Sequence, residues 1–247
     1  MRLLLNICAL PAKKTGCAMS KKKSRKILIY TIVFAVIPIT LFVGAFLFAE
    51  QKYLLVSSII ALLSCIPFFL SFEKKETSTQ RIVILSVMTA LSVAGRFLFS
   101  YAPSFKPVTA VVMICGMYMG SEAGFICGAL SAFISNFIFM QGPWTPFQMF
   151  IWGVIGFVSG VLAPLLKKNK VSLAVGGVLA GIVYSMFMDI WTALWWENSF
   201  SISRYITAVI TAVPVTVVYA VSNVIFLLIL TEPIGRKLER VKKKYGE

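Results

Sequence analysis

The chain contains no histidine and only nine acidic residues, against 24 lysines and arginines. Without histidine, the zinc ligand sets that contain it and the histidine-based nucleophile and base pairs cannot be built. The sequence also has no glycine-rich dinucleotide or ATP loop and no HExxH motif. These absences predict a protein that is not an enzyme. If its activity uses ATP, another subunit must hydrolyse it.

Cysteine is also scarce, and no two cysteines form a CxxC pair. Three of the five lie inside apolar segments, where cysteine behaves as a small hydrophobic residue. The sequence therefore predicts no metal site, no cofactor and no disulfide. The cysteines are Cys8, Cys17, Cys65, Cys115 and Cys127.

Charged residues are only 13% of the chain, whereas 59% is hydrophobic and the mean hydropathy is +0.88. A soluble domain of this size needs more polar surface than this composition supplies. The alternating ten-residue pattern of a membrane β-barrel is absent as well. We therefore expect an all-α integral membrane protein, with the lipid bilayer as its solvent.

The net charge of +15 is concentrated between apolar segments, with 20 of the 24 basic residues in four clusters. Such a distribution indicates membrane topology and not a nucleic-acid-binding surface. The clusters occupy residues 2–26, 73–81, 167–170 and 236–244.

Eight apolar segments are long enough, or nearly so, to cross the bilayer as helices. Residues 107–120 form the shortest of them, and they are either a short tilted span or a re-entrant piece. We prefer a span, because counting it places all four basic clusters on one side. The positive-inside rule then predicts a multi-pass protein of the cell membrane with both termini in the cytoplasm. The segments are residues 27–49, 53–72, 81–101, 107–120, 122–140, 146–166, 171–196 and 204–231.

The hydrophilic stretch 73–81 divides the spans into a plain apolar pair and six helices richer in polar residues. We expect an accessory transmembrane hairpin at 27–72 and a six-helix substrate-binding module at 81–235. A basic cytoplasmic N-terminus occupies residues 1–26, and a basic cytoplasmic tail occupies residues 236–247. Met19 resembles an alternative start, so residues 1–18 are left out of the fold prediction.

Polar side chains at membrane depth are costly, and they are therefore functional candidates. Arg96 either extends to the outer interface or contacts an anion or amide in a pocket that opens outward. Asp189 lies near Trp191, and it either pairs with Arg96, binds a ligand cation or titrates as a proton site. With two tryptophans near these groups, the candidate substrate-binding residues are Arg96, Lys106, Asn136, Gln141, Trp144, Gln148, Asp189, Trp191 and Asn223.

The connection from Gln141 to Gln148 is the most informative stretch of the chain. Its two prolines restrict the backbone, and Gly142 permits a tight turn. Trp144 adds a large flat surface between two amides, which is typical of a clamp for a neutral ligand. The alternative is that Trp144 only belongs to the aromatic belt of the membrane interface.

Small residues recur at four-residue spacing in several spans, which allows helix backbones to approach closely. We expect a tightly packed bundle. The pairs are Ala90 with Ala94, Gly116 with Gly120, Gly124 with Gly128, Gly156 with Gly160, and Gly177 with Gly181.

The six-helix module resembles the S component, the substrate-binding subunit of energy-coupling factor (ECF) vitamin transporters. The segment from Ala90 to Ala94 matches the family's Ala-xxx-Ala docking pattern, and residues 105–109 resemble the segment after its first outer loop. Residues 124–128 resemble the start of its third helix. Asn136 and the 141–148 loop resemble the end of that helix and the loop over the pocket in one branch.

The resemblance implies a six-helix protein that binds a vitamin from outside and associates with a transmembrane coupling subunit and two ATPase subunits. Ala90 and Ala94 would then dock on the coupling subunit. The loop is most similar to S components for cobalamin or a corrinoid precursor, although an aromatic, nearly uncharged pocket also suits riboflavin. The extra hairpin departs from the family pattern.

Two other functions fit the same residues. A solitary secondary transporter would use Asp189 to couple substrate entry to protons, and it would need no ATPase partner. A membrane scaffold would use its polar residues only to hold helices together, and it would bind no small molecule.

Overall fold

The computed structural model describes residues 79–142, 144–197 and 201–245, with the backbone alone for residues 194–197 and 245. Nearer the N-terminus it describes only residue 27, residues 31–36 and residues 38–39, which include the short π-helix η1 (Ile32–Val36). The predicted N-terminus and most of the predicted 27–72 hairpin therefore lie outside the described residues. Within the described part of the chain all regular structure is helical, which confirms the predicted all-α class.

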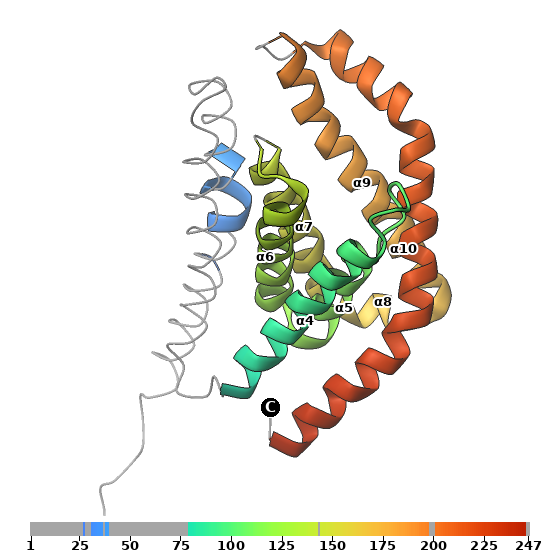
Figure 1. Ribbon diagram of the computed structural model, residues 1–247. Coiled ribbons are helices and arrows are strands. Elements are labelled where there is room, and N and C mark those ends of the chain that lie inside the picture. Colours follow the sequence, from blue (N-terminus) through green and yellow to red (C-terminus); the bar gives the residue numbers. More distant parts are fainter. Residues whose placement is uncertain are drawn as a thin grey trace, which may run out of the picture.

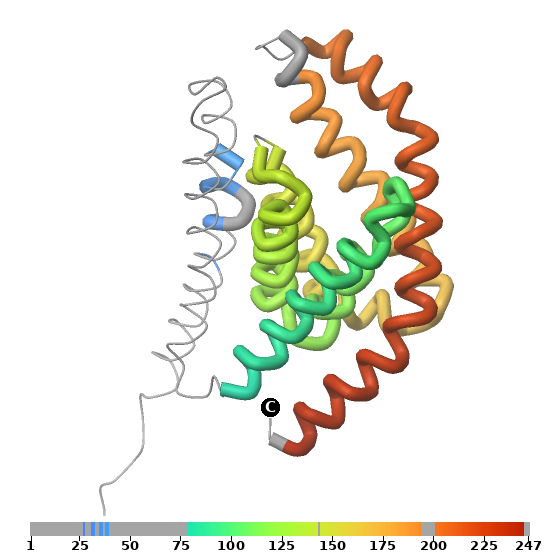
Figure 2. Tube along the Cα trace, viewed as in Figure 1, coloured from blue at the N-terminus to red at the C-terminus, as the bar shows by residue number. Residues whose placement is uncertain are grey.

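The helices of the predicted module follow one another through short connections. Helices α6 and α7 pack side by side, and α9 and α10 form a second antiparallel pair (Figures 1 and 2). Helix α5 lies at the centre, in contact with α4, α6, α7 and α10. The elements are α4 (Thr79–Leu98), α5 (Val108–Met119), α6 (Ser121–Phe139), α7 (Thr145–Val161), α8 (Ala163–Leu166), α9 (Lys170–Glu197) and α10 (Ile202–Tyr245).

Helix α5, predicted as the weakest span, is short and buried. Its 12 residues extend about 18 Å, less than the roughly 30 Å of hydrocarbon in a bilayer. Nearly all of its side chains are covered by neighbouring helices, so its length need not match the lipid. Four other helices, α4, α6, α9 and α10, are long and apolar enough to cross a membrane.

The backbones of α6 and α7 touch where glycines face each other. A side chain at Gly124 would collide with the carbonyl group of Gly156, and one at Gly128 would collide with the backbone of Trp152. Gly116 of α5 meets the same carbonyl of Gly156. The predicted close packing through small residues is confirmed here, and it holds the helix ends that carry the polar residues in a fixed arrangement.

Three of the basic clusters meet at the C-terminal end of α5. Arg81 donates to the Met119 carbonyl oxygen over 3.3 Å, and Lys242 donates to that of Tyr118. The Lys167 ammonium lies 3.5 Å from the centroid of the Tyr118 ring. Cations are favourable at a helix C-terminus, where the last carbonyl groups have no partner in the helix. The C-terminal end of α5 therefore lies at the same end of the bundle as the start of α4. That residues 107–120 cross the bilayer stays a prediction.

Helix α10 continues far beyond the predicted end of the last span. Its 44 residues extend about 66 Å, roughly twice the hydrocarbon thickness, and Pro214 and Pro233 lie within it. The residues predicted to form a separate basic tail are thus helical as far as Tyr245. The start of α4 and the end of α10 lie at the same end of the bundle (Figure 1).

Candidate functional site

The end of the bundle opposite the basic residues holds a buried polar network. Arg96 lies in the last turn of α4, Asn136 in the last turn of α6, and Gln148 in the first turn of α7. The Arg96 Nη1 donates to the Asn136 Oδ1 over 2.8 Å and to the Ser135 hydroxyl. Arg96 therefore points into the bundle with only 8% of its surface exposed, and it does not extend to the outer interface.

Asn136 is the centre of this network. Its Nδ2 donates to the Thr145 Oγ1 over 2.8 Å and to the Gln148 Oε1 over 3.0 Å. The Gln148 Nε2 in turn donates to the Tyr184 hydroxyl over 3.3 Å. A continuous chain of hydrogen bonds thus connects α4, α6, α7 and α9, and each amide is oriented by its neighbours.

Aromatic rings cover one side of the network. The rings of Trp152 and Tyr184 are stacked, with centroids 5.1 Å apart and planes 14° apart, and Tyr219 of α10 meets Tyr184 edge-on. The Arg96 Cζ lies 5.2 Å from the Trp152 ring and 4.8 Å from the Phe139 ring, close enough for cation–π attraction. Polar groups and flat apolar surfaces therefore lie together, as they do in small-molecule sites.

The connection between α4 and α5, residues 99–107, is attached to α10. Phe99 and Phe105 pack against the ring of Phe226, with centroids 5.0 and 5.2 Å from it. The Ser222 hydroxyl donates to the Lys106 carbonyl oxygen over 3.1 Å. This connection therefore closes the polar end of the bundle on the side of α10.

Lys106 brings a second cation to this end. Its Nζ lies 5.3 Å from the centroid of the Phe139 ring, which also contacts Arg96. Burial lowers the pKa of the Lys106 ammonium, and the nearby charge of Arg96 lowers that pKa further. Two positive charges thus share one aromatic neighbour.

The connection between α6 and α7 is built from several local contacts. Met140 has a φ of 72°, which is strained for a side chain of this size. The Gln141 Nε2 donates to the Phe133 carbonyl oxygen over 2.9 Å, so this amide holds the end of α6. The half-buried Trp144 ring lies against Gly142, where any larger residue would collide with it. Trp144 is therefore positioned by its own loop.

Asp189 and Arg96, which one interpretation of the sequence paired, form no ion pair. Asp189 is 8% exposed, and its carboxylate has no hydrogen-bond or ion-pair partner among the described residues. Trp191 packs its ring 5.6 Å from that of Phe147, near the start of α7. Both residues lie in the half of α9 that follows Tyr184, beside the network but outside its hydrogen bonds.

Asn223 has a different position from the other candidates. Its Nδ2 donates to the Gly177 carbonyl oxygen over 3.2 Å, across the contact between α10 and α9. Gly177 and Gly181 bring these two helices together, since a side chain at Gly181 would meet the backbone of Ala220. This amide therefore joins two helices and is not part of the network around Asn136.

Sequence reasoning missed several residues of the site. The four-residue spacing of Gln148 and Trp152 placed both on one face of α7, and that signal was available. No comparable signal marks the tyrosines, because aromatic residues in membrane helices also face lipid. The missed residues are Ser135, Phe139, Thr145, Trp152, Tyr184 and Tyr219. Within the described residues no group of histidine, cysteine or carboxylate side chains is suited to a metal ion.

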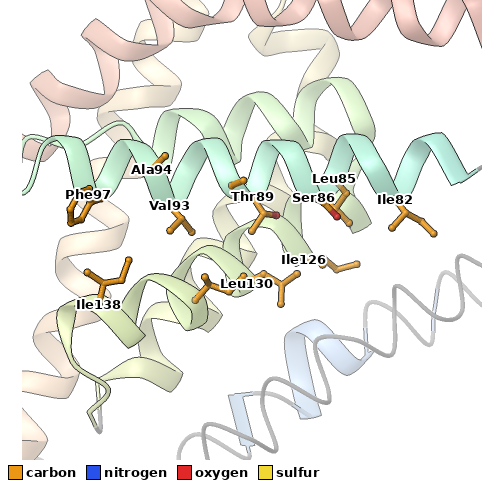
Figure 3. A pocket seen from close by; sticks show the side chains of 12 residues that line it. Ile82, Leu85, Ser86, Thr89, Val93, Ala94, Phe97, Ile126, Leu130 and Ile138 are labelled. Carbon is orange, nitrogen blue, oxygen red and sulfur yellow. The ribbon is translucent and has the colours of Figure 1, made fainter.

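A separate apolar groove lies on the outer face between α4 and α6 (Figure 3). Its volume is about 660 Å³, and the exposed Ala90 and Ala94 belong to its wall. The large hydrophobic residues around them make the groove suitable for an apolar helix. The lining residues are Ile82, Leu85, Ser86, Thr89, Ala90, Val93, Ala94, Phe97, Ile126, Leu130, Ile134 and Ile138.

Residues 76–240 match the family described as the ECF-type riboflavin transporter, S component. The match covers more than half of the chain and runs from just before α4 into the basic part of α10. The polar network and the α4–α6 groove both lie within it, whereas the predicted 27–72 hairpin lies outside. No solved structure matches the chain.

Proposed function

Because the chain belongs to the family of ECF-type riboflavin transporter S components, we propose that it captures a flavin at the network around Asn136. S components are substrate-binding subunits of vitamin transporters and not enzymes. The protein is accordingly a vitamin-specific, multi-pass subunit of the cell membrane. We propose its substrate, its orientation in the membrane and its site residues.

The observation that carries this proposal is the meeting of buried amides with stacked aromatic rings. Asn136 and Gln148 present hydrogen-bonding groups beside the Trp152 and Tyr184 rings. A flat heterocycle with polar edges fits such surroundings, because its faces stack on the rings while its edges bond the amides. The isoalloxazine ring of riboflavin has this form, and the name of the family favours it.

A corrinoid is the second candidate. The 141–148 loop resembles that of S components for corrinoids, and the half-buried Trp144 favours a large ligand beneath it. Cobalamin should therefore be tested beside riboflavin in every binding experiment.

The orientation follows from the basic end of the bundle. Arg81, Lys167 and Lys242 gather around the end of α5, and the positive-inside rule assigns such residues to the cytoplasm. The polar network at the opposite end then faces the outside, where a vitamin is captured. The C-terminus lies in the cytoplasm in this orientation.

The α4–α6 groove is the proposed contact with the transmembrane coupling subunit. Ala90 and Ala94 are exposed there, and small residues let another helix approach closely within lipid. Two ATPase subunits, bound to that coupling subunit, would supply the energy.

The experiment that tests the function is purification of the tagged protein in mild detergent, with identification of the proteins and small molecules retained. We expect a coupling subunit, two ATPases and a flavin. A protein recovered alone that still takes up substrate in response to a proton gradient would favour the secondary transporter. A folded protein that retains and binds no vitamin would favour the scaffold.

A further inference from the structure

Arg96 is a buried cation with no countercharge in the part of the chain that the structure describes. Its hydrogen-bond partners are the neutral side chains of Ser135 and Asn136, both reached from Nη1. Among the described residues no carboxylate pairs with it, and no other hydrogen bond of its guanidinium is present. Burying a charge in this way is unfavourable unless something else compensates it.

Two donors of the guanidinium have no hydrogen-bond partner among the described residues. The rings of Phe139 and Trp152 lie 4.8 and 5.2 Å from its Cζ and hold it in place. Nη1 is occupied, so Nε and Nη2 remain as donors that can bind two oxygens of one group. Bidentate binding of this kind is characteristic of arginine with phosphate and carboxylate.

Lys106 places a second positive charge near the Arg96 guanidinium, because its ammonium lies beside the same Phe139 ring. Asp189, the buried carboxylate of α9, forms no ion pair with either cation among the described residues. The pair therefore makes a local excess of positive charge beside the stacked rings of Trp152 and Tyr184.

We propose that the ligand of this site carries an anionic group, a phosphate or carboxylate, that binds to Arg96 and Lys106 while its ring lies against the aromatic side chains. This inference rests on the proposed function and narrows its substrate class. A flavin with a phosphate on its side chain has the required chemistry. Riboflavin itself lacks the charge and serves as the matched neutral probe.

The test is a fluorescence titration of the purified full chain with riboflavin and with riboflavin 5′-phosphate at low ionic strength. We expect the phosphate form to bind at least about tenfold more tightly, as for charge-assisted hydrogen bonds, and to lose this advantage in high salt. In Arg96→Gln the two flavins bind with equal affinity, whatever the effect of the change on riboflavin itself, while Lys106→Gln reduces the preference less. Lys167→Gln, at the opposite end, changes neither affinity.

Equal binding of the two flavins, or a preference that survives Arg96→Gln, would contradict the proposal that Arg96 binds an anionic group of the ligand. Flavin binding itself would still stand. Binding of neither flavin would instead remove the proposed function, and the inference with it. If Arg96→Gln fails to fold, competition between an inorganic anion and each flavin for the wild-type protein tests the proposal instead. Inorganic sulfate then displaces riboflavin 5′-phosphate and spares riboflavin, whereas equal displacement of both contradicts the proposal.

Discussion

The Arg96 guanidinium donates to the Asn136 side-chain oxygen over 2.8 Å, although 40 positions separate the two residues in the sequence. This bond joins the last turn of α4 to the last turn of α6 and fixes which way the Asn136 amide faces. Because its oxygen accepts from Arg96, its nitrogen must donate to Thr145 and Gln148. The orientation of the whole network follows from this one contact.

Asn136→Leu should remove ligand binding and destabilise the protein. The change removes one hydrogen bond from each of Arg96, Thr145 and Gln148, at a cost of about 1–3 kcal/mol for each buried group left unsatisfied. Thermal unfolding in detergent and a ligand titration measure the two effects.

Asn223→Leu is the matched control, because Asn223 is also a buried amide but, among the described residues, bonds only the Gly177 carbonyl oxygen. It should lower the unfolding temperature and leave affinity unchanged. Loss of binding in both variants, with both proteins folded, would mean that binding follows stability and not the network.

Trp152→Leu should reduce affinity and weaken the quenching of a bound flavin's fluorescence, with Tyr184 left as the other ring of the pair. The change removes one ring of the stacked pair, and a buried aromatic anchor typically contributes about 1–3 kcal/mol to binding. Flavin fluorescence during a titration reports both quantities. Phe157→Leu, a buried aromatic further along α7, serves as the control for general packing damage.

Trp144→Ala tests whether the α6–α7 connection contacts the ligand. We predict weaker binding by about 1–3 kcal/mol, measured by the same titration. Because the Trp144 ring lies against Gly142, a second variant, Gly142→Ala, should displace the ring and weaken binding as well. Unchanged affinity in both variants would remove this loop from the site.

Replacing Ala90 and Ala94 together by Leu should spare ligand binding and abolish uptake, because bulk in the groove would prevent the coupling subunit from docking. Binding in detergent and uptake in proteoliposomes with all subunits separate the two activities. Val83 and Val87 are exposed on the same helix outside the groove wall, so Val83→Leu with Val87→Leu is the matched control. Normal uptake by the alanine variant would show that the contact lies elsewhere.

Asp189→Asn distinguishes the S component from a proton-coupled transporter. Since Asp189 has no ion-pair partner among the described residues, its replacement by an isosteric amide should leave the fold intact. We expect ATP-driven uptake to continue and to remain insensitive to a proton gradient. Uptake that requires both the carboxylate and the gradient would support the secondary transporter.

The sequence predicted the positions of the six module helices closely, because long apolar segments bounded by charges leave few alternatives in lipid. It was less informative about α5, which is shorter than the hydrocarbon layer is thick. Because α5 is buried among other helices, its length need not match the lipid. The extension of α10 was also missed, because its charged residues are typical of a tail outside the membrane and gave no sign that the helix continues.

The candidate site was predicted in composition and not in its connections. Arg96, Asn136 and Gln148 were identified because polar groups are rare in membrane helices, but their mutual bonds depend on how each helix is rotated. The same rarity drew attention to Asn223, which instead joins α9 to α10. Hydrophobicity does not separate an aromatic residue that faces lipid from one such as Tyr184 that faces the network.

The most direct test of the central claim is a titration of the folded, detergent-purified protein with riboflavin, riboflavin 5′-phosphate and cobalamin, in the wild type and in Asn136→Leu. The account predicts saturable binding of a flavin to the wild type and none to the variant. Flavin binding that persists in the variant, or a folded wild-type protein that binds none of these compounds, would contradict it.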